Sequence, residues 1–172
     1  VGRIAAGSKI MFVNDGSKDS TLRLLHAAAA RDTMFSVISL AGNYGHQSAI
    51  LAGMMTARQY ADVVVTIDAD LQQDIEALDK FIDSYTAGSE VVYGVRNDRH
   101  SDGIFKKGSA TLYYNLMHLL GSRVITNHAD YRLMSRKALD ALSEYQEPNL
   151  FLRGLIPTMG FPSDVVYFDV KA

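Results

Sequence analysis

Short apolar runs alternate with segments of helical periodicity along most of the chain. Apolar or β-branched runs bounded by turn-forming residues predict strands, and these runs are Lys9–Val13, Phe35–Leu40, Asp62–Ile67, Glu90–Val95, Tyr131–Met134 and Val165–Val170. Apolar residues that recur at helical spacing predict helices, and these segments are Leu22–Ala29, Ala49–Ala57, Ile75–Tyr85, Phe105–Leu120, Arg136–Leu142 and Leu150–Met159. The alternation predicts an α/β fold with a mostly parallel sheet and helices on both faces.

The segment Asp62–Ile67 carries the clearest strand pattern. Its β-branched residues are apolar on both faces of an extended chain, which is typical of a strand covered on both sides. We therefore expect it to be a central strand with parallel neighbours.

Composition narrows the class of protein. The chain has 172 residues, 48% of them hydrophobic and 21% charged, which suits one domain with its own core. A formal net charge of −2 argues against nucleic acid as a partner. The absence of cysteine excludes disulfides, thiolate metal sites and cysteine nucleophiles. No apolar run approaches the roughly 20 residues that a transmembrane helix needs.

Two aspartates, Asp68 and Asp70, directly follow the clearest strand. Residues two apart on an extended chain point the same way, so both carboxylates could face one spot at the carboxyl edge of the sheet, where ligands bind in open α/β folds. Ionised carboxylates this close repel each other, and a hard cation such as Mg²⁺ or Mn²⁺, with phosphates completing its shell, would relieve that repulsion. A pair of solvated turn or helix-capping aspartates is the structural alternative.

Other candidate residues follow other predicted strands. Asp15 ends the first strand in a turn, where its carboxylate could accept hydrogen bonds from a nucleobase or a ribose; an Asx-turn that only shapes the loop is the alternative. Asp130 and Arg132 alternate along a strand and share a face. They form either a structural ion pair or a catalytic acid beside a phosphate-binding guanidinium. The histidines show no metal-ligand spacing and are interpreted as ordinary surface or core residues, with His128 worth testing because it lies beside Asp130.

Several segments together resemble the motifs of family 2 glycosyltransferases. V-N-D-G-S-K-D-S-T (13–21) resembles the first acidic motif, D-A-D-L-Q (68–72) the metal motif, and H-A-D-Y-R-L-M-S-R (128–136) a segment of the polyprenyl-phosphate branch. That branch includes bactoprenol glucosyltransferases and dolichol-phosphate mannose synthases. N-Y-G-H-Q-S-A (43–49), V-Y-G-V-R (92–96) and N-L-F-L-R-G-L (149–155) match the same branch in order and spacing. The resemblance covers nearly the whole chain and implies a GT-A-type nucleotide-diphospho-sugar transferase fold.

The resemblance also implies a role for each matching residue. Residues implied to bind the nucleotide-sugar are Asp15, Asp68, Gln72 and Arg96, and those implied to hold the metal are Asp70 and Asp68. Gln72 is also implied to help orient the loop that carries these aspartates. Asp130 is implied to be the base that deprotonates or simply orients the acceptor, with Arg132 beside it. Residues implied to contact donor or acceptor phosphate are Arg96, Arg132 and Arg153, and Lys106 is a further candidate because of its charge at the start of an apolar helix.

The function implied is that of an inverting, metal-dependent hexosyltransferase. Its donor would be a nucleotide-sugar, with UDP-glucose favoured, and its acceptor a polyprenyl phosphate at the cytoplasmic face of a membrane. The apolar stripe of Phe105–Leu120 fits packing against the sheet better than contact with lipid, although Lys106 and Lys107 at its start suit an anionic headgroup.

Two departures from the family pattern bear on these expectations. Ala129 stands where the family usually has Gly before the acid of the third motif. Nothing before Lys9 resembles the family's first strand, and the membrane helices usual at its C-terminus have no counterpart. Residues 1–172 are therefore expected to be a fragment of a single catalytic domain. A sheet without that strand would expose unpaired edges, which favours strain, oligomerisation or inactivity.

Three other functions stay open on the sequence. One is a family 2 glycosyltransferase that acts on a glycan acceptor in cell-surface polysaccharide synthesis. Another is a sugar-nucleotide-forming nucleotidyltransferase, although the chain lacks the Gly-rich basic loop usual in those enzymes. The third is a non-catalytic nucleotide-sugar-binding or scaffold domain, which an unchanged activity of Asp70→Asn would favour.

Overall fold

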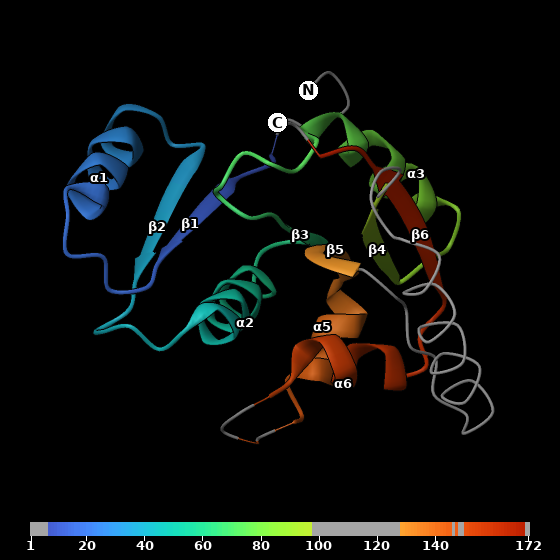
Figure 1. The fold of residues 1–172 in the computed structure, drawn as a ribbon. Helices are drawn as coiled ribbons and strands as arrows, with labels where there is room; N and C mark the ends of the chain where they lie inside the picture. The colour runs from blue at the N-terminus through green and yellow to red at the C-terminus, as the bar shows by residue number, and fades with distance from the viewer. Residues whose placement is uncertain (1–6, 98–127, 146, 148–149, 171–172) are drawn as a thin grey trace, which may run out of the picture.

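The computed structural model describes residues 7–97, 128–145, 147 and 150–170 (Figure 1). Each strand and helix predicted within these residues is present. The predicted helix Phe105–Leu120, which contains Lys106, lies outside the described residues.

The N-terminal part of the chain forms a β–α–β unit. Strands β1 (Ile10–Asn14) and β2 (Phe35–Ser39) pair in parallel, and α1 (Thr21–Arg31) connects them. Helix α2 (His46–Ala57) then packs against β1. Gly53 permits that close approach, since a Cβ atom there would lie 2.9 Å from Cγ2 of Val13.

The second sheet contains the remaining described strands in the order β3-β5-β4-β6. Their bounds are Val63–Thr66 for β3, His128–Ser135 for β5, Val91–Arg96 for β4 and Ser163–Phe168 for β6. Strand β5 runs antiparallel to β3 and β4, whereas β4 and β6 are parallel. The molecule therefore has a mixed sheet in addition to its parallel pair.

The expectation that Asp62–Ile67 forms a central, parallel strand is wrong. Strand β3 lies at the end of its sheet and pairs antiparallel with β5. Its valines are nevertheless packed on both faces: Val64 joins one core cluster, and Val63 and Val65 join the other. Cover by helices on both faces, and not a central position, accounts for the apolar pattern.

Helices cover both faces of the second sheet, as the sequence predicts. On one face lie α5 (Arg136–Leu142), α6 (Leu152–Thr158) and part of α2. The core on this side contains Met54, Val91, Tyr93, Met134, Leu139, Leu142, Leu152 and Ile156. On the other face lie η1 (Ile75–Ala77) and α3 (Leu78–Thr86), over a core of Phe81, Val92, Tyr131, Leu133, Val166 and Phe168.

The two sheets are not hydrogen-bonded to each other in the described part of the chain. There β1 pairs only with β2, and β3 only with β5. Helix α2 contacts both β1 and β3 and so connects the two sheets (Figure 1). In these same residues no helix combines the length and the apolar character that crossing a membrane requires.

Candidate functional site

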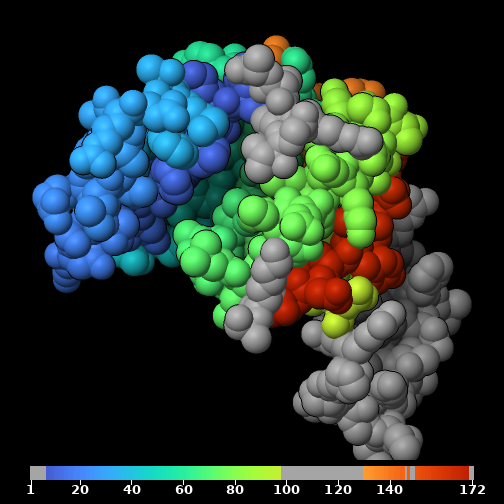
Figure 2. Space-filling view, turned by 90° about the horizontal axis from the view of Figure 1, so that it is seen from above, coloured from blue at the N-terminus to red at the C-terminus, as the bar shows by residue number. Residues whose placement is uncertain are grey.

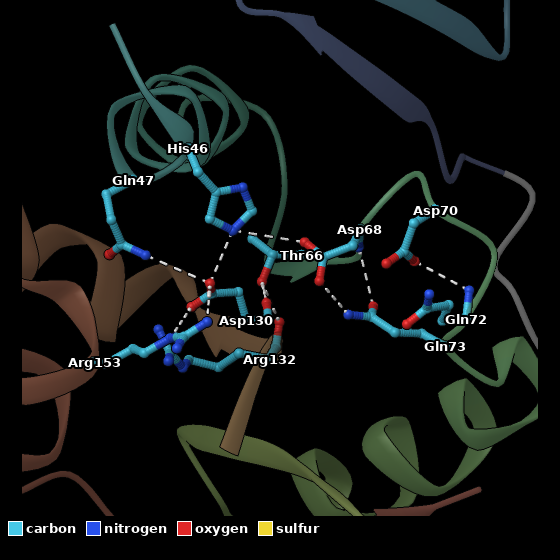
Figure 3. A network of polar contacts seen from close by, with 10 residues as sticks. All are labelled: His46, Gln47, Thr66, Asp68, Asp70, Gln72, Gln73, Asp130, Arg132 and Arg153. Atoms are coloured by element: carbon cyan, nitrogen blue, oxygen red, sulfur yellow. Dashed lines mark hydrogen bonds and ion pairs between the residues drawn. The ribbon is translucent and has the colours of Figure 1, made fainter. Parts of the chain in front are cut away.

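Asp68 and Asp70 lie in the loop that follows β3 (Figure 3). The strand ends at Thr66, so the alternation of an extended chain does not reach Asp70, which lies in a turn. The Oδ1 atom of Asp70 accepts a hydrogen bond from the backbone N–H of Gln72 at 3.0 Å. Leu71 between them has a φ of 63°, in the left-handed region that a leucine adopts at a cost.

Gln73 fixes the orientation of Asp68. Its Nε2 donates to Oδ2 of Asp68 at 2.6 Å, and its Oε1 accepts the backbone N–H of Asp68 at 3.0 Å. Gln73 is buried, whereas Gln72 is exposed and contributes its backbone N–H to the turn. The family resemblance implied that Gln72 orients this loop. In the structure it is the side chain of Gln73 that contacts Asp68.

The surroundings of Asp68 favour a bound positive charge. Burial raises the pKa of its carboxyl above the ordinary value, and the negative charges of Asp130 and Asp70 raise it further. Electrostatic interactions with His46 and Arg96 lower the pKa but do not cancel the rise. An ionised Asp68 is therefore held at a cost that a cation would reduce.

Asp130 and Arg132 lie on the same face of β5, as their alternation predicts. Each is only 2% exposed. The guanidinium of Arg132 lies 5.4 Å from the centre of the Tyr93 ring, and burial lowers its pKa. Thr66 of β3 fixes this part of the strand, since its hydroxyl donates to the carbonyl oxygens of Asp130 and Arg132.

Donors from two helices hold the Asp130 carboxylate (Figure 3). Arg153 of α6 donates from Nε to Oδ1 at 3.1 Å and from Nη2 to Oδ2 at 2.7 Å. His46 and Gln47, the first residues of α2, place their Nε2 atoms 2.8 and 3.4 Å from Oδ2. Arg153 therefore forms a bidentate ion pair with Asp130.

These contacts change the acidity of Asp130. Burial alone would raise the pKa of the carboxyl, but hydrogen bonds from Arg153 and His46, with the charge of Arg153 and then of Arg132, outweigh it. The net result lowers the pKa from 3.8 to about 2. A carboxylate with so low a pKa accepts a proton poorly near neutral pH.

His46 lies between Asp130 and Asp68, and no pattern in the sequence predicted it as a site residue. Its Nε2 lies 2.8 Å from Oδ2 of Asp130 and 3.7 Å from Oδ1 of Asp68. Only its place in the N-Y-G-H-Q segment, just before a helix that follows a strand, could have drawn attention to it. His128, which the sequence analysis singled out, lies at the start of β5.

Asp15 and Arg96 lie at the ends of other strands. Asp15 directly follows β1, and its carboxylate accepts the backbone N–H groups of Tyr44 and Gly45. Arg96 is the last residue of β4 and is half-buried. Seen from above, the molecule is hollowed between the blue N-terminal elements and the green segment that follows β3 (Figure 2).

The residues that could hold a cation are few. No group of three or more His, Asp and Glu side chains in the described ranges is arranged to bind a metal ion. Asp68 and Asp70 nevertheless fit a Mg²⁺ or Mn²⁺ ion that completes its shell with phosphate and water, because such ions often use only one or two protein carboxylates. The raised pKa of Asp68 is consistent with that fit.

An open groove of about 660 Å³ begins beside Asp130. His46 and Gln47, which hold the carboxylate, also line this groove. The rest of its lining is largely apolar and comprises Tyr44, Gly45, Ser48, Leu51, Ala52, Met55, Leu150 and Phe151.

Comparisons with known proteins agree with the resemblance seen in the motifs. The family model described as glycosyl transferase family 2 matches residues 6–143. An uncharacterized glycosyltransferase, YkoT of Bacillus subtilis, is 48% identical over 168 residues, which cover 98% of this chain and 50% of that protein. A bactoprenol glucosyl transferase of Shigella phage SfX is 35% identical over 93% of this chain and 52% of its own length. A prophage bactoprenol glucosyl transferase homolog of Escherichia coli K12 is 34% identical over the same shares. The chain thus spans about half the length of the curated relatives it matches.

Proposed function

This chain belongs to glycosyl transferase family 2 and has the α/β fold of GT-A type that the family implies, and from that premise we propose a specific reaction. The protein transfers a hexose from a nucleotide-sugar, with UDP-glucose favoured, to a polyprenyl phosphate, and inverts the anomeric carbon. The names of the bactoprenol glucosyl transferases that it resembles support the choice of acceptor and sugar. We place the reaction at the cytoplasmic face of a membrane, where nucleotide-sugars and the phosphate ends of such lipids meet.

The state of Asp130 is the observation that carries this proposal. Both of its oxygens accept hydrogen bonds, and its pKa is lowered to about 2. A hydroxyl of a glycan would need a base to take its proton as it attacks, and this carboxylate is too weak a base for that task. A lipid phosphate is already ionised and needs only to be oriented. Asp130 therefore orients the acceptor indirectly, because it holds the side chains of Arg153, His46 and Gln47 in place.

The groove beside Asp130 suits the isoprenoid chain of such an acceptor. Arg153 uses Nε and Nη2 for Asp130 and is 46% exposed, so its outer side can meet a phosphate. Leu51, Met55 and Leu150 line the groove beyond His46 and Gln47. A phosphate at the arginine would leave its isoprenoid chain to lie along these apolar side chains.

The donor half of the reaction falls to the loop after β3. Asp68 and Asp70 would hold Mg²⁺ or Mn²⁺, which would neutralise the charge that develops on the leaving diphosphate. Gln73 keeps Asp68 in position for this, and Arg96 adds positive charge near Asp68. We propose a single displacement, which inverts the anomeric carbon.

Calorimetric titration tests the donor site. UDP, GDP and UDP-glucose would each be titrated into the full-length protein with and without Mn²⁺, and into Asp70→Asn and Asp140→Asn variants. Asp140 is a matched control, since it is an exposed aspartate that pairs with Arg58 on the surface. We expect one nucleotide to bind only with metal, in the wild type and in Asp140→Asn but not in Asp70→Asn. Failure of every nucleotide to bind would contradict the transferase and favour a scaffold; equal binding by Asp70→Asn would contradict the metal site.

A further inference from the structure

Asp15 occupies an unexpected position for a residue thought to contact the nucleoside. Its Oδ1 accepts the backbone N–H of Tyr44 at 2.7 Å, and its Oδ2 accepts that of Gly45 at 2.9 Å. These donors lie about thirty residues further along the chain, in the loop that enters α2. The carboxylate is therefore neither a local Asx-turn nor simply turned toward solvent.

The loop that Asp15 holds lies between the turn after β1 and the first turn of α2. Gly45 is the N-cap of α2, has a φ of 88° and offers no side chain to the helix end. The turn after β1 approaches this loop so closely that a Cβ atom on Gly16 would lie 2.6 Å from the carbonyl carbon of Gly42. The hydroxyl of Ser48 closes the turn from the helix side by donating to the carbonyl of Tyr44 at 2.9 Å.

The residues that follow the held loop are those that hold Asp130. His46 comes directly after Gly45, and Gln47 comes next. Their Nε2 atoms lie 2.8 and 3.4 Å from Oδ2 of Asp130. One peptide unit thus separates the backbone N–H that Asp15 binds from the imidazole that meets Asp130. A displacement of the loop would therefore move the backbone that carries the imidazole.

We propose that Asp15 is a positioning residue for Asp130, acting through the loop 42–45 to aim His46 and Gln47 at that carboxylate. The end of β1 is thereby connected to the acceptor side of the site. The consequence for turnover rests on the proposed function, whereas the geometric connection does not.

The test uses the full-length protein labelled with ¹⁵N only at histidine. His46 is assigned by the signal that a His46→Gln variant lacks. The test variants are Asp15→Ala and Asp15→Asn; the latter keeps the size of the side chain in case the former does not fold. Asp32→Ala is the matched control, since Asp32 accepts the backbone N–H of Met34 at 2.8 Å in the turn between α1 and β2.

We expect the Nε2 signal of His46 to move in the Asp15 variants in the same direction as in Asp130→Asn, and to stay in place in Asp32→Ala. An unchanged signal in both folded Asp15 variants would overturn the proposal. This readout needs no donor, acceptor or activity, so it gives its answer even if the proposed reaction is wrong.

Kinetics provide the second readout if the reaction is observed. Asp15→Ala should lower kcat on the order of tenfold, because the side chains that hold Asp130 would be misplaced, whereas Asp32→Ala should keep the wild-type kcat. Asp15→Ala and His46→Ala should be non-additive, because both act on the same contact. An unchanged kcat in folded Asp15→Ala protein would overturn the proposal.

Discussion

Replacement of Asp130 by Asn keeps the shape of the side chain and removes its charge. In the folded chain the pKa of this carboxyl is lowered from 3.8 to about 2. At about 1.4 kcal/mol for each pKa unit, the charged form contributes about 2 kcal/mol to the free energy of unfolding. We therefore expect Asp130→Asn to lose about 2 kcal/mol at pH 7, or roughly 4–8 °C in Tm for a domain of this size.

The dependence on pH identifies the cause of this loss. Because the folded pKa lies below the unfolded one, the stabilisation is fully present above pH 3.8 and fades as the pH falls toward about 2. The difference between wild type and Asp130→Asn should shrink to roughly half by pH 3. Urea unfolding followed by circular dichroism, from pH 7 down to pH 3, measures this difference directly.

Asp140→Asn is the matched control for this measurement. Asp140 also faces an arginine, with Oδ1 3.4 Å from Nη1 of Arg58, but its side chain is 59% exposed. Exposed pairs contribute little, so its variant should stay within about 1 kcal/mol of wild type. If Asp130→Asn behaved like this control, or if its loss did not change with pH, the reasoning about the buried Asp130–Arg153 pair would be refuted.

The other predictions concern the loops around the site. Asp68→Asn should raise the free energy of unfolding at pH 7, because burial, together with neighbouring carboxylates, raises the pKa of Asp68 and makes its ionised form costly above that pKa; a lower urea midpoint in the variant would contradict this. Leu71→Gly should stabilise by about 1 kcal/mol, since a φ of 63° strains leucine and not glycine, and an unchanged Tm would disprove the strain. Gly16→Ala should cost about 2 kcal/mol or more, because its Cβ would meet the backbone of Gly42 at 2.6 Å. Gly7→Ala, which meets nothing within 4 Å, should have no effect on the same thermal scan.

Local patterns in the sequence predict most of the fold. The helix Arg136–Leu142 has the bounds that its periodicity predicts, and the shared face of Asp130 and Arg132 follows from the alternation of a strand. The pairing of β3 could not be predicted in this way. Its partner β5 comes from far along the chain, where Thr66 meets Arg132, and no local pattern specifies that meeting.

The acidic positions of the site were also predicted, but their partners were not. Asp15, Asp68 and Asp130 each follow or lie on a strand, and motifs reveal such positions. Which donors meet them depends on how helices dock. His46 meets Asp130 because α2 packs between the two sheets, and Arg153 does so because α6 covers the same face.

The adjacent glutamines illustrate the same limit on a smaller scale. Gln73 points inward to Asp68 and Gln72 outward, after a turn that contains the left-handed Leu71. The motif implied that Gln72 orients the loop, since a run of two glutamines does not indicate which one faces the core. The roles proposed for Arg96 and Lys106 remain predictions.

We propose that the acceptor arrives already ionised, so that Asp130, which is held as a poor base, does not need to deprotonate it. The most direct measurement supplies the full-length protein with radiolabelled UDP-glucose, Mg²⁺ and either a polyprenyl phosphate or the matching uncharged polyprenol, and counts label in the extracted lipid. We expect label on the phosphate only, because only the phosphate is ionised without the help of a base. Equal transfer to the polyprenol, or label on neither lipid, would contradict this expectation.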